Sequence, residues 1–353
     1  MPKNIKDLSK GNKTEEILRY YFKGLGFYVV RGVQVNYKNV NITDIDLLLY
    51  NKNSSFSKER INVDIKDKKK PKAVERIFWT KGIQNNLGLD KCIVATSDSR
   101  PEVTEFGKKQ DVVVLDGSFL SELKRRDFKI DRVSEEYLKE ELSKNELNKF
   151  LGDWWSRYEM SKTRLISGLN FSGFNQCLED IKLLFQDIIS HPTKSAYYLR
   201  YLYLIISHSL VIIDYIIGSI PFMSQEEKLD LLNEGFKHGT QGKAKTDHIL
   251  GIVSKLVSAY VTDGDKIIRQ IKKDLDSTSK DIPTEVLSEF FSNTSNTNHL
   301  FDYAKRFEFV GFKKEVVHPD KLESDLKGLL ALYLDFSQIS RKDFFGIAPK
   351  EVK

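Results

Sequence analysis

Three acidic residues and one lysine in the first third of the sequence have the types needed for chemistry on a phosphate group. Asp64 and Lys66 are separated by a single residue, Asp46 precedes them by one predicted strand, and Glu15 lies in a predicted helix. Carboxylate oxygens are the ligands that suit Mg²⁺ or Mn²⁺. A bound metal of this kind polarises a phosphoryl oxygen and acidifies its water, and a neighbouring lysine stabilises developing negative charge. These residues predict a site for metal-dependent hydrolysis of a phosphodiester.

The segment INVDIK (61–66) predicts the strand that carries two of these residues. Apolar and polar residues alternate along it, which is typical of a strand with one buried face. Because successive side chains of a strand point to opposite faces, Asp64 and Lys66 share the face opposite Ile61 and Val63. A basic run and an amphipathic segment follow directly.

The segment DIDLLLY (44–50) predicts a neighbouring strand, on which Asp44 and Asp46 share one face. The polar connection 51–60 is long enough for a hairpin, and in a hairpin the acids of both strands can converge on one point. Asp44 is an alternative to Asp46. We favour Asp46 because an aliphatic pair follows it directly.

The first predicted helix (13–26) supplies the third acid. At about 100° per residue, Glu15 falls on the border of the apolar face that contains Phe22, whereas Glu16 points nearly opposite, toward solvent. Glu15 is therefore the glutamate expected to reach over the edge of the sheet. Gly26 is expected to end this helix.

The remaining patterns of the first 126 residues complete an α-β-β-β-α-β-α-β-α order. The later strands are continuous apolar runs, as expected when helices cover both faces of a sheet. In the helix expected over about residues 73–87, Val74, Ile77, Phe78 and Ile83 form the apolar side, and Trp79 is expected to pack in the core. The predicted strands are 27–35, 44–50, 61–66, 91–97 and 111–117, and the predicted helices are 13–26, 73–87, 100–110 and 118–126.

Taken together, these features resemble the PD-(D/E)xK nuclease superfamily and, within it, the Mrr-like restriction endonuclease domain. The family pattern is a helical glutamate, a strand aspartate and an acid-x-lysine on the next strand, matched here by Glu15, Asp46, Asp64 and Lys66. CIVATS and VVVLDGSFL resemble the later strands and closing helix, so the likeness covers about residues 10–125. The proline of the family name is absent, and Asp replaces the more usual Glu at position 64.

The resemblance implies a restriction-endonuclease-like mixed sheet flanked by helices. It implies that Asp46, Asp64, Lys66 and Glu15 are catalytic and that the three acids bind Mg²⁺ or Mn²⁺. The expected activity is hydrolysis of DNA by an endonuclease, in restriction or another anti-phage defence. A double-strand cut usually needs two active sites, so a homodimer is expected. The alternatives are a nuclease of the same fold acting on RNA or on branched or single-stranded DNA, and a non-catalytic nucleic-acid-binding or scaffold protein.

The basic run KDKKKPK next to the predicted site is expected to contact the DNA backbone, since each neutralised phosphate adds salt-sensitive affinity. Gln84, on the following helix, is a candidate accessory residue. The predicted DNA contacts are Lys68, Lys69, Lys70 and Lys72.

Composition and charge agree with two soluble units. The chain has 353 residues and a net charge of +6, but residues 1–130 contain 26 Lys/Arg against 17 Asp/Glu. This basic first part favours a polyanionic partner. We expect a nuclease-like domain over 1–128 and an all-α domain over 129–353, which serves recognition, sensing, oligomerisation or the binding of a partner protein.

We place a boundary between about residues 126 and 135, and beyond it the patterns predict helices and no sheet. The long apolar stretch 201–223 contains His208 and Asp214, so we expect a buried core helix and no membrane span. Arg200 and His208 are too far apart for a HEPN ribonuclease motif, so His208 is expected to be a satisfied core histidine. The expected helical segments are 135–190, 193–218, 224–236, 244–275, 283–292 and 321–335.

Residue usage excludes some classes of site. The first 130 residues contain no histidine, which argues against an HNH or zinc nuclease there. Only two cysteines are present, Cys92 and Cys177, and the N-terminus has no apolar signal segment. A cytoplasmic protein is therefore expected.

Overall fold

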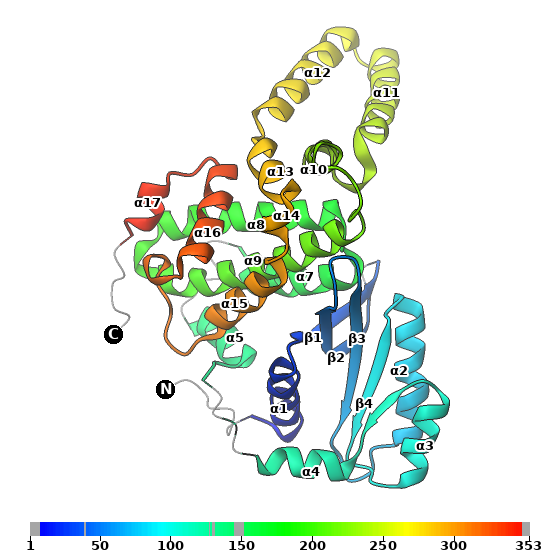
Figure 1. The fold of residues 1–353 in the computed structure, drawn as a ribbon. Coiled ribbons are helices and arrows are strands. Elements are labelled where there is room, and N and C mark those ends of the chain that lie inside the picture. Colours follow the sequence, from blue (N-terminus) through cyan, green and yellow to red (C-terminus); the bar gives the residue numbers. More distant parts are fainter. Residues whose placement is uncertain (1–7, 39, 127, 129–130, 145–151, 348–353) are drawn as a thin grey trace.

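The computed structural model describes residues 8–347 apart from 39, 127, 129–130 and 145–151. Its first part has the predicted element order (Figure 1). The helices are α1 (Lys10–Gly24), α2 (Ala73–Leu87), α3 (Pro101–Lys109) and α4 (Gly117–Arg125), and the strands are β1 (Tyr28–Tyr37), β2 (Val40–Lys52), β3 (Lys58–Lys66), β4 (Lys91–Thr96) and β5 (Val113–Leu115).

The five strands form one mixed sheet in the order β1-β2-β3-β4-β5. The first three strands pair as an antiparallel meander, which confirms the predicted hairpin between β2 and β3. The last three are parallel and are connected through α2 and α3, as parallel neighbours require a crossover. The expectation of a mixed sheet flanked by helices is confirmed.

Helices cover both faces of this sheet. Helices α1 and α4 pack on the face that presents Leu47, Leu49 and Val63. Helices α2 and α3 cover the opposite face of the parallel strands, where Cys92 and Val94 point. Gly26 ends the first helix in the left-handed region, with φ of 94°, and its amide donates to the Lys23 carbonyl. That conformation suits glycine, as predicted.

The buried side of α2 differs from the prediction. Ile77 is buried, but Phe78 and Trp79 are 59% and 46% exposed, so the core position expected for Trp79 is wrong. Val74, also expected on the apolar side, is exposed as well. The residues of α2 that face the sheet are mainly small or polar, whereas Phe78 contacts Phe106 of α3.

The second part is helical, as expected, and the described residues there contain only an isolated β-bridge. Residues 145–151 of the expected segment 135–190 lie outside the described residues. The prediction omitted α15, in which charged residues interrupt the apolar ones, and the short helices α14 and α17. The helices are α5 (Glu135–Lys144), α7 (Trp154–Ser167), α8 (Phe171–Ser190), η2 (Pro192–Lys194), α9 (Ser195–Gly218), α10 (Gln225–His238), η3 (Gly239–Gln241), α11 (Gly242–Tyr260), α12 (Gly264–Asp281), α13 (Thr284–Ser292), α14 (Thr294–Thr297), α15 (Leu300–Phe312), η4 (Pro319–Lys321), α16 (Ser324–Phe336) and α17 (Arg341–Phe345).

Helix α9 is the centre of this helical part, and nearly all of its side chains are buried. With η2 it forms the one helix among the described residues that is long and apolar enough to cross a membrane, yet most of it lies inside the protein. Most of its buried polar side chains have hydrogen-bond partners, with the Tyr198 hydroxyl as an exception. The Ser161 hydroxyl forms a hydrogen bond with Nδ1 of His208 at 2.8 Å. Burial lowers the pKa of His208 to about 3, so this histidine is neutral. The predicted core helix with a satisfied histidine is confirmed.

The helical part packs directly on the sheet. Tyr28 and Tyr50, from β1 and β2, belong to the same apolar cluster as α9. Asp214 of α9 accepts a hydrogen bond from the Tyr50 hydroxyl at 2.7 Å and pairs with Lys52 at 2.8 Å and Lys58 at 3.0 Å. Asp214, an acidic residue in the apolar helix α9, therefore links that helix to the sheet. The division at residue 128 stays a prediction.

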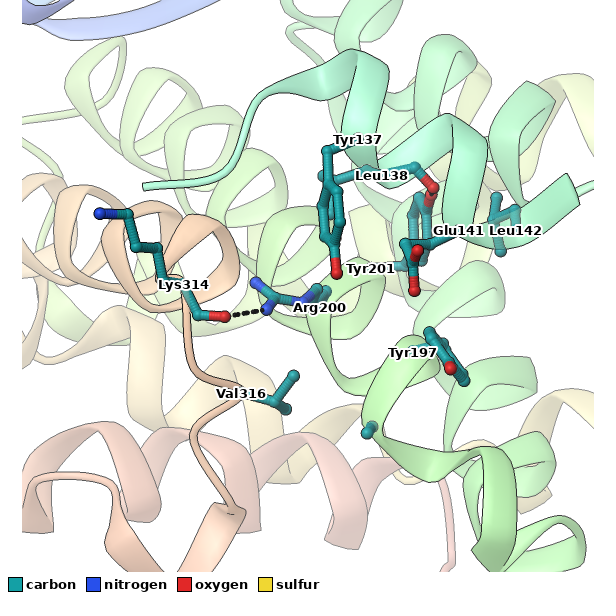
Figure 2. A pocket seen from close by; sticks show the side chains of 10 residues that line it. Tyr137, Leu138, Glu141, Leu142, Tyr197, Arg200, Tyr201, Lys314 and Val316 are labelled. Atoms are coloured by element: carbon teal, nitrogen blue, oxygen red, sulfur yellow. Dashed lines mark hydrogen bonds between the residues drawn. The ribbon is translucent and has the colours of Figure 1, made fainter. Parts of the chain in front are cut away.

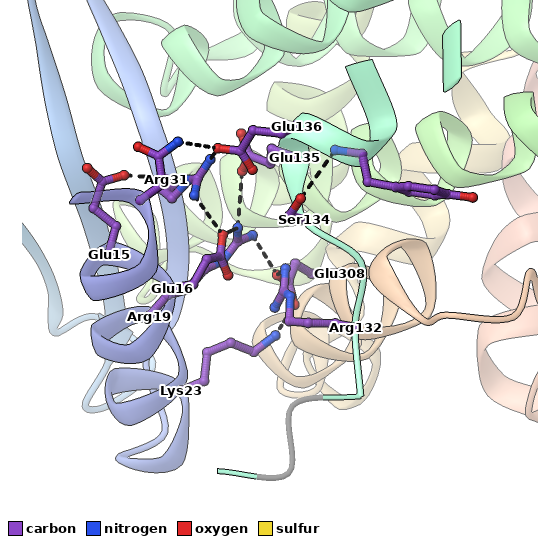
Figure 3. A network of polar contacts seen from close by, with 12 residues as sticks. Glu15, Glu16, Arg19, Lys23, Arg31, Arg132, Ser134, Glu135, Glu136 and Glu308 are labelled. Carbon is purple, nitrogen blue, oxygen red and sulfur yellow. Dashed lines mark hydrogen bonds and ion pairs between the residues drawn. The ribbon is translucent and has the colours of Figure 1, made fainter. Parts of the chain in front are cut away.

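A buried network of charges forms a second link between the two parts (Figure 3). Arg19 of α1 pairs with Glu135 at 3.1 Å and with Glu308 of α15 at 2.9 Å. Glu308 also pairs with Lys23 and, at 2.9 Å, with Arg132. Burial alone would raise the pKa of Glu308, but Arg132, Lys23 and Arg19 outweigh it and hold that pKa well below its usual range.

Glu16 belongs to this network, so its predicted exposure is wrong. Its side chain is 1% exposed and lies 3.1 Å from Arg31 and 3.5 Å from Arg19. The sequence pattern of α1 predicts that the side of the helix carrying Glu16 is polar, and in the structure its neighbours are charged side chains. The cations come from α1 and β1, and Glu135 and Glu308 of the second part pair with Arg19 and close over this side, which a single helix does not reveal.

Replacing Glu308 with alanine is expected to destabilise the fold strongly. The change leaves Arg19 and Arg132 buried beside each other without their shared carboxylate, and breaking a buried pair typically costs about 3–5 kcal/mol. The free energy of unfolding in urea at neutral pH measures this loss.

Glu323→Ala is the matched control, because Glu323 also pairs with an arginine but is exposed. That change should cost less than about 1 kcal/mol. Equal losses for the two variants would contradict the role given to the buried network.

Candidate functional site

Asp46 and Asp64 lie where β2 and β3 separate. The last paired residues of the two strands are Leu47 and Val63. Beyond them, the Ile65 amide donates to Oδ2 of Asp46 at 2.6 Å. A side-chain carboxylate thus accepts a hydrogen bond from the β3 backbone just past the end of the ladder, which fixes the Asp46 carboxylate at the open end of the hairpin.

Lys66 lies between the two acids. Its ammonium nitrogen is 3.4 Å from Oδ2 of Asp46 and 3.6 Å from Oδ1 of Asp64. Burial raises the pKa of Asp46, an effect that Lys66 and the Ile65 amide oppose and Asp64 reinforces. The structure thus brings together three of the four residues singled out in the sequence.

Arg76 of α2 is the partner that the sequence did not identify. Its Nε lies 2.8 Å from Oδ2 of Asp64, and its Nη2 contacts Oδ1. Its guanidinium also lies over the Trp79 ring, with 5.7 Å between Cζ and the ring centroid. A signal was available, because only six residues separate β3 from α2. The first turns of α2 must therefore return over the end of that strand.

Glu15 lies near Asp46 but turns toward Arg31 (Figure 3). Its Oε2 is 3.8 Å from Nε of Arg31. Burial raises the pKa of Glu15 to about 7, while Arg31 lowers it and Asp46 raises it. Asp46 is therefore close enough for its charge to act on Glu15.

The acids do not form a ready-made metal site. Within the described ranges, no three His, Cys, Asp or Glu side chains gather so that they could hold a metal ion. Arg76 occupies both oxygens of Asp64. The cavity between Asp46 and Asp64 measures about 10 Å³, at or below what one water needs. The donor types suit Mg²⁺ or Mn²⁺, but Arg76 must leave Asp64 before a cation can enter.

The predicted DNA-binding lysines project from a loop that is held in place beside this site. Asp67 accepts from Thr14 of α1 at 2.8 Å and from Lys124 of α4 at 2.6 Å. Lys72 pairs with Glu75. The exposed lysines are Lys68, Lys69, Lys70 and Lys72.

The two accessory candidates occupy different places. Asp44 is exposed, accepts from Asn41 at 3.1 Å and lines the same small cavity as Asp46. Gln84 is buried, donates to the Asp90 carbonyl at 2.9 Å, and does not line that cavity. Gln84 therefore has a structural contact at the far end of α2.

The helical part contains a larger cavity beside Arg200 (Figure 2). The Arg200 guanidinium donates to backbone carbonyls of Gly311, Lys313 and Lys314. These carbonyls lie at the C-terminal end of α15, where an arginine commonly satisfies unpaired acceptors. Arg200 thus caps a helix and has no contact with His208 that would suggest a shared reaction.

Comparisons with known proteins found no family model, no curated protein and no solved structure that matches this chain.

Glu15→Gln is expected to remove part of the pH dependence of stability. Because the pKa of Glu15 is raised from 4.5 to about 7 on folding, the wild type loses stability as pH rises through this window, by about 2–3 kcal/mol. The neutral glutamine avoids that loss. The difference in unfolding free energy between variant and wild type should grow from pH 4.5 to 7 in urea titrations.

Glu75→Gln provides the control, since Glu75 is exposed and pairs with Lys72. Its effect should be small and flat over the same range. A flat difference for Glu15→Gln as well would contradict the burial of an ionisable Glu15.

Proposed function

We propose that this protein is a metal-dependent nuclease that hydrolyses DNA and that its sheet domain is restriction-endonuclease-like. One observation carries the proposal. Lys66 lies between Asp46 and Asp64 where two antiparallel strands diverge, in a mixed sheet whose elements follow the predicted order. Paired carboxylates that can hold a metal, with an adjacent lysine, suit the hydrolysis of a phosphodiester.

Each residue has a role that follows from its surroundings. Asp46 and Asp64, joined by Glu15, would hold Mg²⁺ or Mn²⁺, which when bound supplies a Lewis acid and an acidified water. Lys66 neutralises negative charge developing on the phosphate. Because the pKa of Glu15 is near 7, Glu15 can take up or release a proton at neutral pH.

Arg76 sets the condition for activity. Arginine binds carboxylate and phosphate with the same two-pronged geometry, so a DNA phosphate can replace Asp64 as its partner. Substrate binding would then free the oxygens of Asp64 for the cation. The exposed lysines of the loop 68–72 would hold the adjacent backbone.

The closed Asp64–Arg76 pair also favours a second candidate, a nucleic-acid-binding protein without catalysis. In that case Arg76 would keep Asp64 neutralised permanently, and the carboxylates would only stabilise the sheet. The same basic loop would still bind the backbone of DNA or RNA.

Cleavage assays distinguish these functions. Plasmid, linear single-stranded DNA and RNA are incubated with wild type, Asp64→Asn or Lys66→Ala and Mg²⁺ or Mn²⁺. We expect cleavage of duplex DNA by the wild type and a loss of at least about 100-fold in rate for each variant, because each removes charge stabilisation from the transition state.

Asp111→Asn controls for loss of an acid, since Asp111 is almost fully exposed, and should cleave normally. Asp44→Asn should retain activity if Asp46 is the ligand. Cleavage that survives Asp64→Asn would refute the site, and binding of DNA without cleavage by the wild type would establish the second candidate.

The basic loop is expected to determine the salt dependence of DNA binding. In the double variant Lys69→Ala/Lys70→Ala, the slope of log affinity against log salt should shrink by about 1–2, since each phosphate contact contributes about 0.9. Fluorescence anisotropy with a labelled duplex measures it. The double variant Lys108→Ala/Lys109→Ala, on the exposed side of α3, should keep the wild-type slope, and equal slopes for all three proteins would exclude the loop from the interface.

A further inference from the structure

Helices α11 and α12 form an arm that projects from the helical body (Figure 1). They are antiparallel neighbours joined by residues 261–263. Gly264 begins α12 close to the preceding helix, where a Cβ atom would lie 2.4 Å from the Val257 carbonyl oxygen. This glycine allows the close turn, so the arm is a defined hairpin of two long helices.

The arm exposes a set of large apolar side chains that a solvated hairpin does not need. On α11 they recur at intervals of three and four residues, which is one stripe of a helix. On α12 they recur every four residues. The exposed apolar residues are Ile249, Ile252, Val253, Leu256, Tyr260, Val261, Ile267, Ile271 and Leu275.

The two stripes lie on the same side of the arm. The less exposed Leu250 and Val257 on α11 and the buried Ile268 on α12 mark the contact between the helices. At about 100° per residue, Leu256 lies about 100° behind Val257, and Ile271 lies about 60° behind Ile268, so both stripes are offset from the contact in the same rotational sense along their own helix. Because the helices are antiparallel, equal senses place both stripes on one continuous face.

The area of this face matches that of a stable protein–protein interface. With an accessible surface on the order of 180 Å² for each side chain, the exposed fractions amount to about 800 Å², the area that each partner buries in a standard interface. Contiguous apolar surface of this size on a soluble protein marks an interaction site.

We propose that the occupant of this face is the arm of a second copy of the chain. Two identical hairpins that meet through one apolar face form a four-helix bundle, in which all four stripes become core. The pairing is isologous, so one twofold axis closes the dimer.

The charges of the arm favour this occupant over an anionic surface. Residues 242–281 contain eight Lys/Arg and six Asp/Glu, so two arms repel each other little. A lipid surface or a nucleic acid would select a predominantly basic arm. In Figure 1 the arm points away from α2 and α3, and pairing through it leaves that end of the sheet uncovered. The proposal is therefore independent of the nuclease activity.

Light scattering after gel filtration of the full-length chain tests the dimer. The wild type is expected at twice the mass of 40.8 kDa. Leu256→Asp on α11 and Ile271→Asp on α12 should each elute as monomers, because either charge would be buried in the bundle. Far-UV circular dichroism confirms that each variant remains folded, since both side chains are exposed in the single chain.

Two controls separate the arm from general loss of apolar surface. Leu25→Asp, at the residue that follows α1 and is as exposed as Leu256, and Leu256→Met, which keeps the apolar stripe, should both remain dimeric. A monomeric wild type would overturn the proposal. A dimer that persists in folded Leu256→Asp and Ile271→Asp would overturn it equally.

Discussion

The buried charges around Arg19 and Glu308 are the interaction on which the arrangement of this protein depends. They join α1, which lies on the sheet, to α15 in the helical part. A buried ion that loses its partner is costly, so the network favours the one relative position of the two parts that satisfies every member. Asp214, held by Tyr50, Lys52 and Lys58, adds a second polar contact of the same kind.

This network also reaches the candidate site. Arg31 contacts Glu16 inside the network and Glu15 at its edge, so the helical part influences the charge and direction of Glu15 through the cations it helps to position. Arg76 acts on Asp64 from the other side. Arg31 and Arg76 thus pair with Glu15 and Asp64, two of the three acids. In this state the protein's own arginines neutralise these carboxylates, which is why the site is closed to a cation.

The two ends of the molecule have different physical character. At the sheet, polar groups are paired with one another and the surface is basic, a combination suited to an anionic ligand that competes for arginine and lysine. At the arm, large apolar side chains are exposed, and association is what would remove them from water. The proposed chemistry and the proposed assembly therefore use separate surfaces.

The sequence by itself determined the order of elements in the sheet part, the hairpin of β2 and β3, the meeting of Asp46, Asp64 and Lys66, and the core role of α9, because strand alternation and helix periodicity are local properties. Only the tertiary structure decided the burial of Glu16, the exposure of Trp79 and the pairing of Asp64 with Arg76. These depend on which element covers a given face. The covering residue can lie 12 positions away, as Arg76 does from Asp64, or 289 positions away, as Glu308 does from Arg19.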